Sequence, residues 1–198
     1  KNWRDLIQRI IDDTSLNIFL VGSIDEKEYF NVFYPLHQRV YDISGMTSVP
    51  ELITIMQESK CVVATDSGSA HIAGAVAKNI ISIHGPTNSY QSSPYSTKNN
   101  NIKIASLNLE CSPCYRTDVI KNCKKNRCMQ ELDASKIMGL INEFNLSTFT
   151  IWANNSQHSD SVTITLRSSI ADTDDSDFEL IYLDELSEVT FLSLSNTN

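Results

Sequence analysis

The sequence predicts an α/β protein in which a parallel, Rossmann-like sheet carries helices on both faces. The main observation is the order of elements between residues 61 and 84, where two short apolar runs enclose a helix of small residues. An amphipathic helix at 3–12 and an apolar run at 17–21 extend the same alternation toward the start of the chain. Strands that alternate with helices across short connections form parallel sheets with right-handed crossovers.

Composition and charge narrow the class of protein. The chain has 198 residues, of which 41% are hydrophobic and 20% charged, as in ordinary globular proteins with one substantial core. No apolar run approaches the roughly 20 residues that a membrane-spanning helix needs. The net charge of -8 argues against non-specific binding to nucleic acid or membranes through the overall field, although it leaves a local basic patch open.

The predicted elements follow from periodicity and from helix-start signals. Ser48, with Pro50 and Glu51 behind it, has the spacing of a capping box and predicts a helix start. The full set comprises strands at 17–21, 39–43, 61–64, 80–84 and 102–105, a loop at 87–101, and helices at 3–12, 26–33, from 48 onward, at 67–77 and from 133 to 144.

The character of the chain changes after Asn145. Three segments at 162–167, 178–183 and 189–194 are strand candidates, and the first of them alternates apolar and polar residues as a half-buried strand does. We therefore predict a Rossmann-like domain at residues 1–146, with a four-cysteine insertion at 111–128. Residues 147–198 are expected to form a β-rich extension separate from it.

Two polar turns follow neighbouring predicted strands. Asp66, Ser67 and Gly68 lead from the first strand into a helix, and such a helix start presents backbone N–H groups and a positive dipole end to an anion. Gly85-Pro86-Thr87 follows the next strand. Ligands of open α/β sheets bind beyond the carboxyl ends of the strands, so the pattern favours a nucleotide-diphosphate site. An ordinary capped turn is the alternative, and His84 fits either a packing residue or a ligand contact.

At these residues the chain resembles glycosyltransferase family 9, which includes the ADP-heptose:lipopolysaccharide heptosyltransferases. The family signature D-[ST]-G-x-x-H, followed later by G-P-T, matches Asp66 to His71 and Gly85 to Thr87. The resemblance covers roughly residues 3–144. It also includes Leu20-Val21-Gly22 with Glu26 after it, Ser44-Gly45-Met46, and the cysteines from 111 onward.

The resemblance implies a GT-B fold, in which two Rossmann-like domains face each other, and it assigns this chain to the half that binds the nucleotide-sugar donor. By position it implies that Asp66 and His71 are catalytic, with His71 facing the diphosphate or the sugar. The implied donor-binding residues are Glu26 for the ribose, Met46 for the base, and Ser67, Gly68, Gly85 and Thr87 for the diphosphate or the turns around it. A solvated acid at Glu26 and plain core packing of Met46 are the alternatives.

The implied activity is transfer of a sugar, heptose above all, from ADP-heptose or another nucleotide-sugar to a lipopolysaccharide, other glycan or protein acceptor. Oriented backbone amides and a helix dipole can stabilise the departing diphosphate without a catalytic metal. The resemblance implies a cytoplasmic protein, and peripheral attachment at the inner membrane and a homo-oligomeric state both stay open.

The resemblance implies that the acceptor-binding N-terminal half and the general base lie outside these residues. The chain lacks an initial Met and begins inside a predicted helix, which suggests a fragment or a processed piece. The 198 residues alone are therefore expected to bind a nucleotide-sugar weakly and not to catalyse transfer. The alternatives are a non-catalytic nucleotide-sugar-binding or assembly module and, less favoured, a sugar-nucleotide epimerase of similar fold.

Four of the five cysteines lie close together, as Cys111-x2-Cys114-x8-Cys123-x4-Cys128. This spacing suits a structural tetrahedral site for zinc or iron, with no open position for chemistry. Arginines and lysines surround the cysteines and are expected to favour thiolates. The pattern also resembles the iron-binding cluster of autotransporter heptosyltransferases. Free or oxidised thiols are the alternative.

Overall fold

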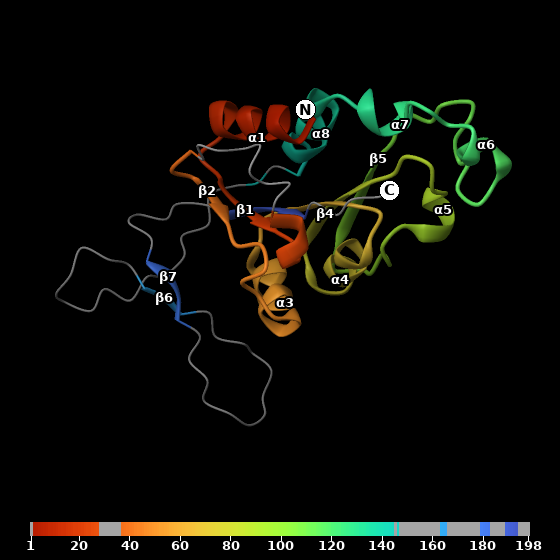
Figure 1. Ribbon diagram of the computed structural model, residues 1–198. Helices are drawn as coiled ribbons and strands as arrows, with labels where there is room; N and C mark the ends of the chain where they lie inside the picture. Colours follow the sequence, from red (N-terminus) through yellow and green to blue (C-terminus); the bar gives the residue numbers. More distant parts are fainter. Residues whose placement is uncertain are drawn as a thin grey trace.

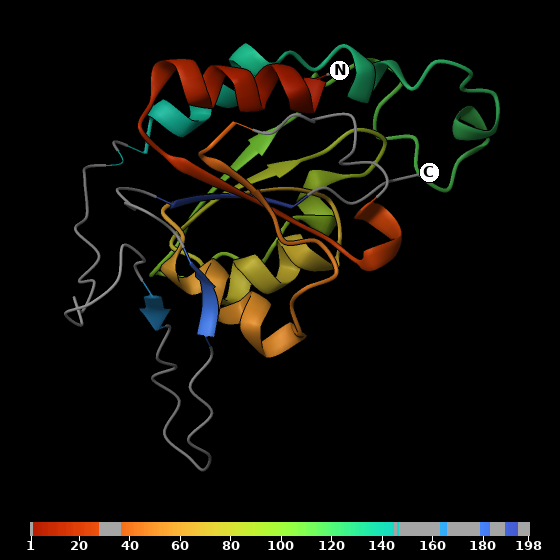
Figure 2. The ribbon, with the colours of Figure 1, turned by 60° about the vertical axis from the view of Figure 1, so that its left-hand side comes forward.

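The protein forms three layers, with a six-stranded sheet between two pairs of helices (Figure 1). The computed structural model describes residues 2–27, 37–144 and 146, together with the backbone of three later strands. One face of the sheet carries α1 (Asn2–Asp13) and α8 (Ala134–Asn142), and the other carries α3 (Val49–Glu58) and α4 (Gly68–Val76) (Figure 2).

Every neighbouring pair of strands in the main sheet is parallel, in the order β2-β1-β8-β3-β4-β5. All carboxyl ends therefore lie at one edge of the sheet. The strands are β1 (Asn17–Val21), β2 (Val40–Asp42), β3 (Val62–Thr65), β4 (Asn79–Ile83), β5 (Asn101–Ala105) and β8 (Val189–Ser193).

The remaining elements are short. They are the 3-10 turn η1 (Ile24–Glu26), the helices α5 (Ser89–Ser92), α6 (Asp118–Lys121) and α7 (Arg127–Gln130), and an antiparallel pair formed by β6 (Thr163–Thr165) and β7 (Glu179–Tyr182). Among the residues that the structure describes, no helix is both long and apolar enough to cross a bilayer.

The core explains why β3 and β4 read as continuous apolar runs. All residues of both strands are buried, as expected for parallel strands covered on both faces. Ile81 packs with Leu6 and Ile10 of α1 and with side chains of α8, whereas its neighbour Ile80 packs on the other face with Met56 of α3. Successive residues of one strand thus contribute to two separate core layers.

The predicted helix starts are confirmed. Glu51 accepts hydrogen bonds from the backbone N–H and the hydroxyl of Ser48, at 2.5 and 2.6 Å, and so closes the capping box that begins α3. The Asp133 carboxylate accepts from the Ser135 N–H at 2.7 Å and caps α8. The parallel α/β architecture predicted from element order is confirmed as well.

Three predictions differ from the structure or fall outside it. The predicted helix at 26–33 lies mostly in residues 28–36, outside the described residues. Within the predicted loop at 87–101, residues 89–92 form the single turn α5. The strand expected at 189–194 is β8, which lies inside the main sheet between β1 and β3 rather than in a separate extension. Sequence periodicity identifies a strand but not its pairing partner.

Candidate functional site

Two turns meet at the carboxyl edge of the sheet, one after β3 and one after β4. The strands are in register from Val62 opposite Ile80 to Thr65 opposite Ile83. Beyond that pairing, the N–H of Asp66 donates to the carbonyl of Ile83 at 3.0 Å. The first turn runs into α4, and the second contains Gly85-Pro86-Thr87. The two motifs singled out in the sequence are therefore neighbours in space, as predicted.

The start of α4 is open at Gly68. Ser67 is the extended N-cap residue, and its carbonyl accepts from the N–H groups of Ala70 and His71. The Ser67 hydroxyl donates to the Thr65 carbonyl at 3.1 Å. In the part of the chain that is described, the N–H of Gly68 makes no hydrogen bond, and a Cβ built on Gly68 would meet no atom within 4 Å.

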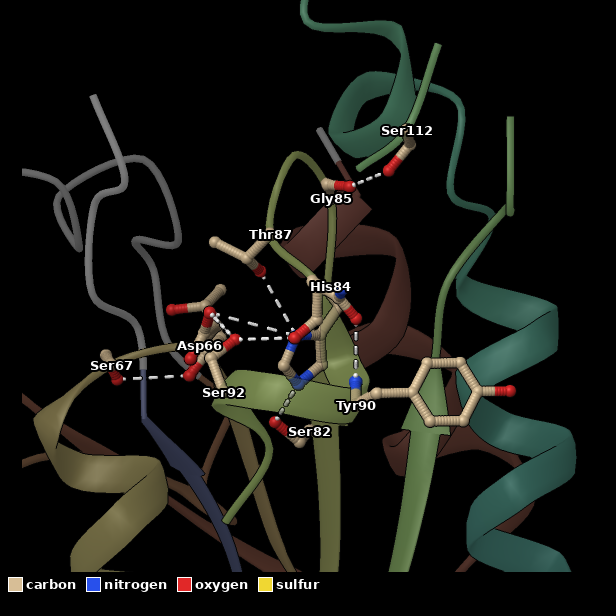
Figure 3. Close-up of polar contacts among 11 residues, drawn as sticks. Asp66, Ser67, Ser82, His84, Gly85, Thr87, Tyr90, Ser92 and Ser112 are labelled. Carbon is tan, nitrogen blue, oxygen red and sulfur yellow. Dashed lines mark hydrogen bonds and ion pairs between the residues drawn. The ribbon is translucent and has the colours of Figure 1, made fainter. Parts of the chain in front are cut away.

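His84 is the centre of a polar cluster between the two turns (Figure 3). Its side chain is 1% exposed, and its ring lies between the hydroxyls of Ser82 and Thr87, with Nε2 at 2.9 Å from Ser82 Oγ and Nδ1 at 3.1 Å from Thr87 Oγ1. The Asp66 carboxylate lies 3.8 Å from Nδ1. Burial lowers the pKa of His84, the charge of Asp66 opposes this, and His71 lowers the pKa further.

The two predicted catalytic residues lie in different surroundings. Asp66 has a side chain that is only 10% exposed, and its Oδ2 accepts a hydrogen bond of 2.8 Å from the Ser92 hydroxyl. His71 is exposed in the first turns of α4, yet close enough for its charge to affect His84. The structure thus brings Asp66 and Thr87 to the cluster around His84, leaves Ser67 bonded within the first turn, and leaves His71 exposed on α4. Their roles remain predictions.

Glu26 and Met46 lie at the same edge but beside β1 and β2. Two strand spacings, about 10 Å, separate β1 from β3. Glu26 Oε2 accepts from the N–H of Ser23 at 2.7 Å and from its hydroxyl at 3.0 Å, so this carboxylate caps η1. Met46 is 57% exposed, so the core-packing alternative for this residue is wrong.

Gly85 lies directly beneath the cysteine segment. A Cβ at this position would come within 2.4 Å of Met129 Sδ and 3.1 Å of Cys128 Sγ. The Ser112 hydroxyl donates to the Gly85 carbonyl, and the N–H groups of Cys114 and Tyr115 both donate to the carbonyl of Pro86 at 2.8 Å (Figure 3 shows the Ser112 contact). The absence of a side chain at Gly85 therefore allows this segment to pack on the second turn.

The four clustered cysteines are all free thiols; Cys114 and Cys128 are buried, whereas Cys111 and Cys123 are exposed. Burial and, to a smaller extent, the neighbouring thiols raise the pKa of both Cys114 and Cys128. Loss of solvent at these two positions therefore opposes the effect expected of the basic neighbours. Within residues 2–27 and 37–144, no three His, Cys, Asp or Glu side chains gather as metal ligands.

Sequence reasoning assigned no role to Ser82, Ser92 or Ser112, and for His84 it left both a packing role and a ligand contact open. Each of these serines bonds to a residue of the two turns. The sequence did contain a signal for the capping role of Glu26. Ser23 and Glu26 have the same Ser-x-x-Glu spacing as the capping box at Ser48.

Comparisons with known proteins place these features in a family. The model of glycosyltransferase family 9 (heptosyltransferase) matches residues 1–125. The chain is 26% identical over 126 residues to the lipooligosaccharide heptosyltransferase 2 of Campylobacter jejuni strain NCTC 11168, an alignment that covers 61% of this chain and 38% of that protein. It is 32% identical over 69 residues to the enzyme of the same name from Haemophilus influenzae, covering 35% of this chain and 20% of that one.

Solved structures show the same fold. ADP-heptose lps heptosyltransferase II of E. coli matches with a TM-score of 0.58 and 18% identity, over 73% of this chain and 40% of that chain. A family 9 glycosyltransferase from Veillonella parvula matches with a TM-score of 0.57 and 14% identity, over the same shares of the two chains. The chain thus spans about two fifths of the length of these relatives. Since the family model covers more than half of its residues, the chain belongs to glycosyltransferase family 9.

Proposed function

We propose that the described residues form the donor-binding part of a glycosyltransferase, which holds the diphosphate of a nucleotide-sugar at the start of α4. The observation that carries this proposal is the exposed Gly68 at the carboxyl edge of the sheet, whose N–H makes no hydrogen bond within the described residues, next to the cluster of Asp66, His84 and Thr87. A helix start of this kind supplies both a donor and a positive dipole end for an anion.

The names of the relatives support ADP-heptose as the donor and a lipopolysaccharide or lipooligosaccharide as the acceptor. A protein acceptor is the second candidate, favoured by the cysteine spacing. We propose that a second Rossmann-like half contributes the acceptor site and the general base, and that the enzyme works in the cytoplasm, at the inner membrane surface when its acceptor is a lipid.

The geometry suits stabilisation of a leaving group. When the bond between sugar and diphosphate breaks, negative charge grows on the diphosphate oxygens. An oriented N–H at Gly68, the dipole of α4 and the hydroxyl of Thr87 stabilise that charge without reorganisation. The exposed imidazole of His71, in the first turns of the same helix, adds a donor or a positive charge when protonated.

Replacing Gly68 by alanine tests the site. Because an added Cβ comes within 4 Å of no atom of the described residues, the variant is expected to fold with wild-type stability. The methyl group would stand where the diphosphate approaches the backbone, so affinity for ADP is expected to fall by about tenfold. Isothermal titration calorimetry with ADP and with an ADP-sugar measures this.

The matched control is Gly139→Ala. Gly139 lies in α8, where a built Cβ likewise has no atom of the described part of the chain within 4 Å. This helix covers the face of the sheet opposite α4. This variant should bind ADP as the wild type does. Failure of the folded wild-type chain to bind ADP or any ADP-sugar would refute the proposed function. Equal affinity in both glycine variants would show that the diphosphate does not bind at the start of α4.

We also propose that the cysteine segment holds a structural zinc or iron ion. The four sulfur donors suit such a centre, and the thiols of Cys114, Cys123 and Cys111 are all close enough to Cys128 to raise its pKa, after the larger effect of burial. Because three ligands do not converge in the structure described, Cys111 and Cys123, both exposed, would have to turn toward the buried pair.

Elemental analysis of protein purified without added metal tests the ion. We expect about one zinc or iron per chain, lost in Cys123→Ser and retained in Cys61→Ser, since Cys61 is a buried thiol of the sheet core. Traces of both metals far below the protein concentration would rule the site out.

A further inference from the structure

The His84 ring is held on both of its nitrogens by groups from different parts of the sheet edge (Figure 3). Nε2 faces Ser82, which is fully buried in β4, the strand that ends just before His84. Nδ1 faces the second turn, through Thr87, and the first turn, through Asp66. One imidazole thus spans the gap between the two turns.

The surroundings of the ring select its protonation state. Burial disfavours the imidazolium and lowers the pKa of His84, so the ring is neutral at pH 7 and carries one N–H. Asp66 is an acceptor on the Nδ1 side, and Ser82 can donate to Nε2. The proton is therefore best placed on Nδ1, with Nε2 accepting from the Ser82 hydroxyl.

This tautomer fixes what Thr87 can offer. If Nδ1–H donates to Thr87 Oγ1, the Thr87 hydroxyl is an acceptor toward the histidine, and its own hydrogen is left to donate elsewhere. Thr87 is half-buried, in the turn after β4 and beside the start of α4. The Asp66 carboxylate is held from its other side by Ser92, at 2.8 Å.

We propose that His84 is a positioning residue of the donor site, which in its Nδ1–H form sets the spacing of the two turns and directs the Thr87 hydroxyl toward the donor diphosphate. The inference rests on the proposed function. His84 itself does not touch the donor, since its side chain is almost completely buried. It acts through Thr87 and Asp66.

Two conservative substitutions test the contacts of Nδ1 and of Nε2 separately. In His84→Asn the side-chain amide reaches the place of Nδ1 and keeps a hydrogen-bonding group toward Thr87 and Asp66. In His84→Gln the amide reaches the place of Nε2 and keeps only the contact with Ser82. We expect His84→Asn to bind ADP within about threefold of the wild type, and His84→Gln to bind it about tenfold more weakly.

The measurements are ADP titration calorimetry, thermal unfolding of both variants, and 15N NMR of the imidazoles in histidine-labelled wild type. The signals of His84 are those missing from the His84→Asn spectrum, and they are expected to show a protonated Nδ1 and an unprotonated Nε2. Thr87→Val, which removes only the hydroxyl, should weaken ADP binding as much as His84→Gln does.

The outcomes separate the two proposals. If the wild type does not bind ADP, the proposed function fails. If it binds, but affinity in the two histidine variants falls equally and in proportion to their loss of thermal stability, His84 has only a structural role and the inference is overturned. A protonated Nε2 in the wild type would overturn it as well.

Discussion

Gly45→Ala is expected to lower the free energy of unfolding by about 2–4 kcal/mol. Gly45 has a φ of +69°, a left-handed conformation that alanine adopts only at a cost. A Cβ at this position would also lie 2.8 Å from the Cα of Ile24, and this backbone atom cannot turn aside as a side chain would. The N–H of Gly45 donates to the Gly22 carbonyl at 2.8 Å, so the substitution strains the contact between the ends of β1 and β2.

Chemical denaturation of Gly45→Ala beside Gly139→Ala measures this effect. Gly139 lies within a helix, and a Cβ there would contact none of the residues that the structure describes, so its replacement should stabilise the protein by about 0.5–1 kcal/mol. Met46 follows Gly45 directly, so a shifted turn would also displace the predicted base-binding side chain. A Gly45→Ala variant as stable as the wild type would contradict the turn geometry described here.

Ile80→Ala and Ile81→Ala are each expected to cost about 2–5 kcal/mol. The two residues are adjacent in β4 and fully buried, but they face opposite layers of helices. Truncating either one removes several methyl groups from a packed layer and leaves a cavity. Equally large losses at both positions are therefore the signature of a sheet covered on its two faces.

The control for this pair is Val119→Ala in α6, where the side chain is half exposed and the change should stay within about 0.5 kcal/mol. Urea unfolding followed by far-UV circular dichroism provides all three values. A cost below about 1 kcal/mol at Ile80 alone would mean that α3 and α4 do not cover their face of the sheet.

The sequence was sufficient for the elements whose signals are local. The apolar spacing of 3–12 identified α1, and the Ser48–Glu51 pair identified the start of α3. Two apolar runs, each followed by a polar turn, predicted that the turns after β3 and β4 meet at the carboxyl edge of the sheet. Each of these features depends on residues that are close together in the sequence, so a single sequence carries the information.

Features that join distant residues could not be obtained in this way. The position of β8 between β1 and β3 depends on pairing across more than a hundred residues. The contact of Ser92 with Asp66 and the packing of Cys128 on Gly85 depend on side-chain placement in three dimensions. At Glu26 the resemblance to the family suggested a ribose contact, and the local capping pattern explains what that carboxylate bonds to in the structure.

The N–H groups of Cys114 and Tyr115 both donate to the Pro86 carbonyl, so the backbone of Tyr115 is attached to the turn after β4. The Tyr115 ring can therefore report ligand binding at this edge of the sheet. The ring is half exposed, with the Arg116 guanidinium over it, so its surroundings change when the backbone beneath it shifts. A fluorine nucleus introduced on this tyrosine would therefore report occupancy of the neighbouring turn through its chemical shift. This measurement needs no label on the nucleotide and no modification of the cysteine thiols.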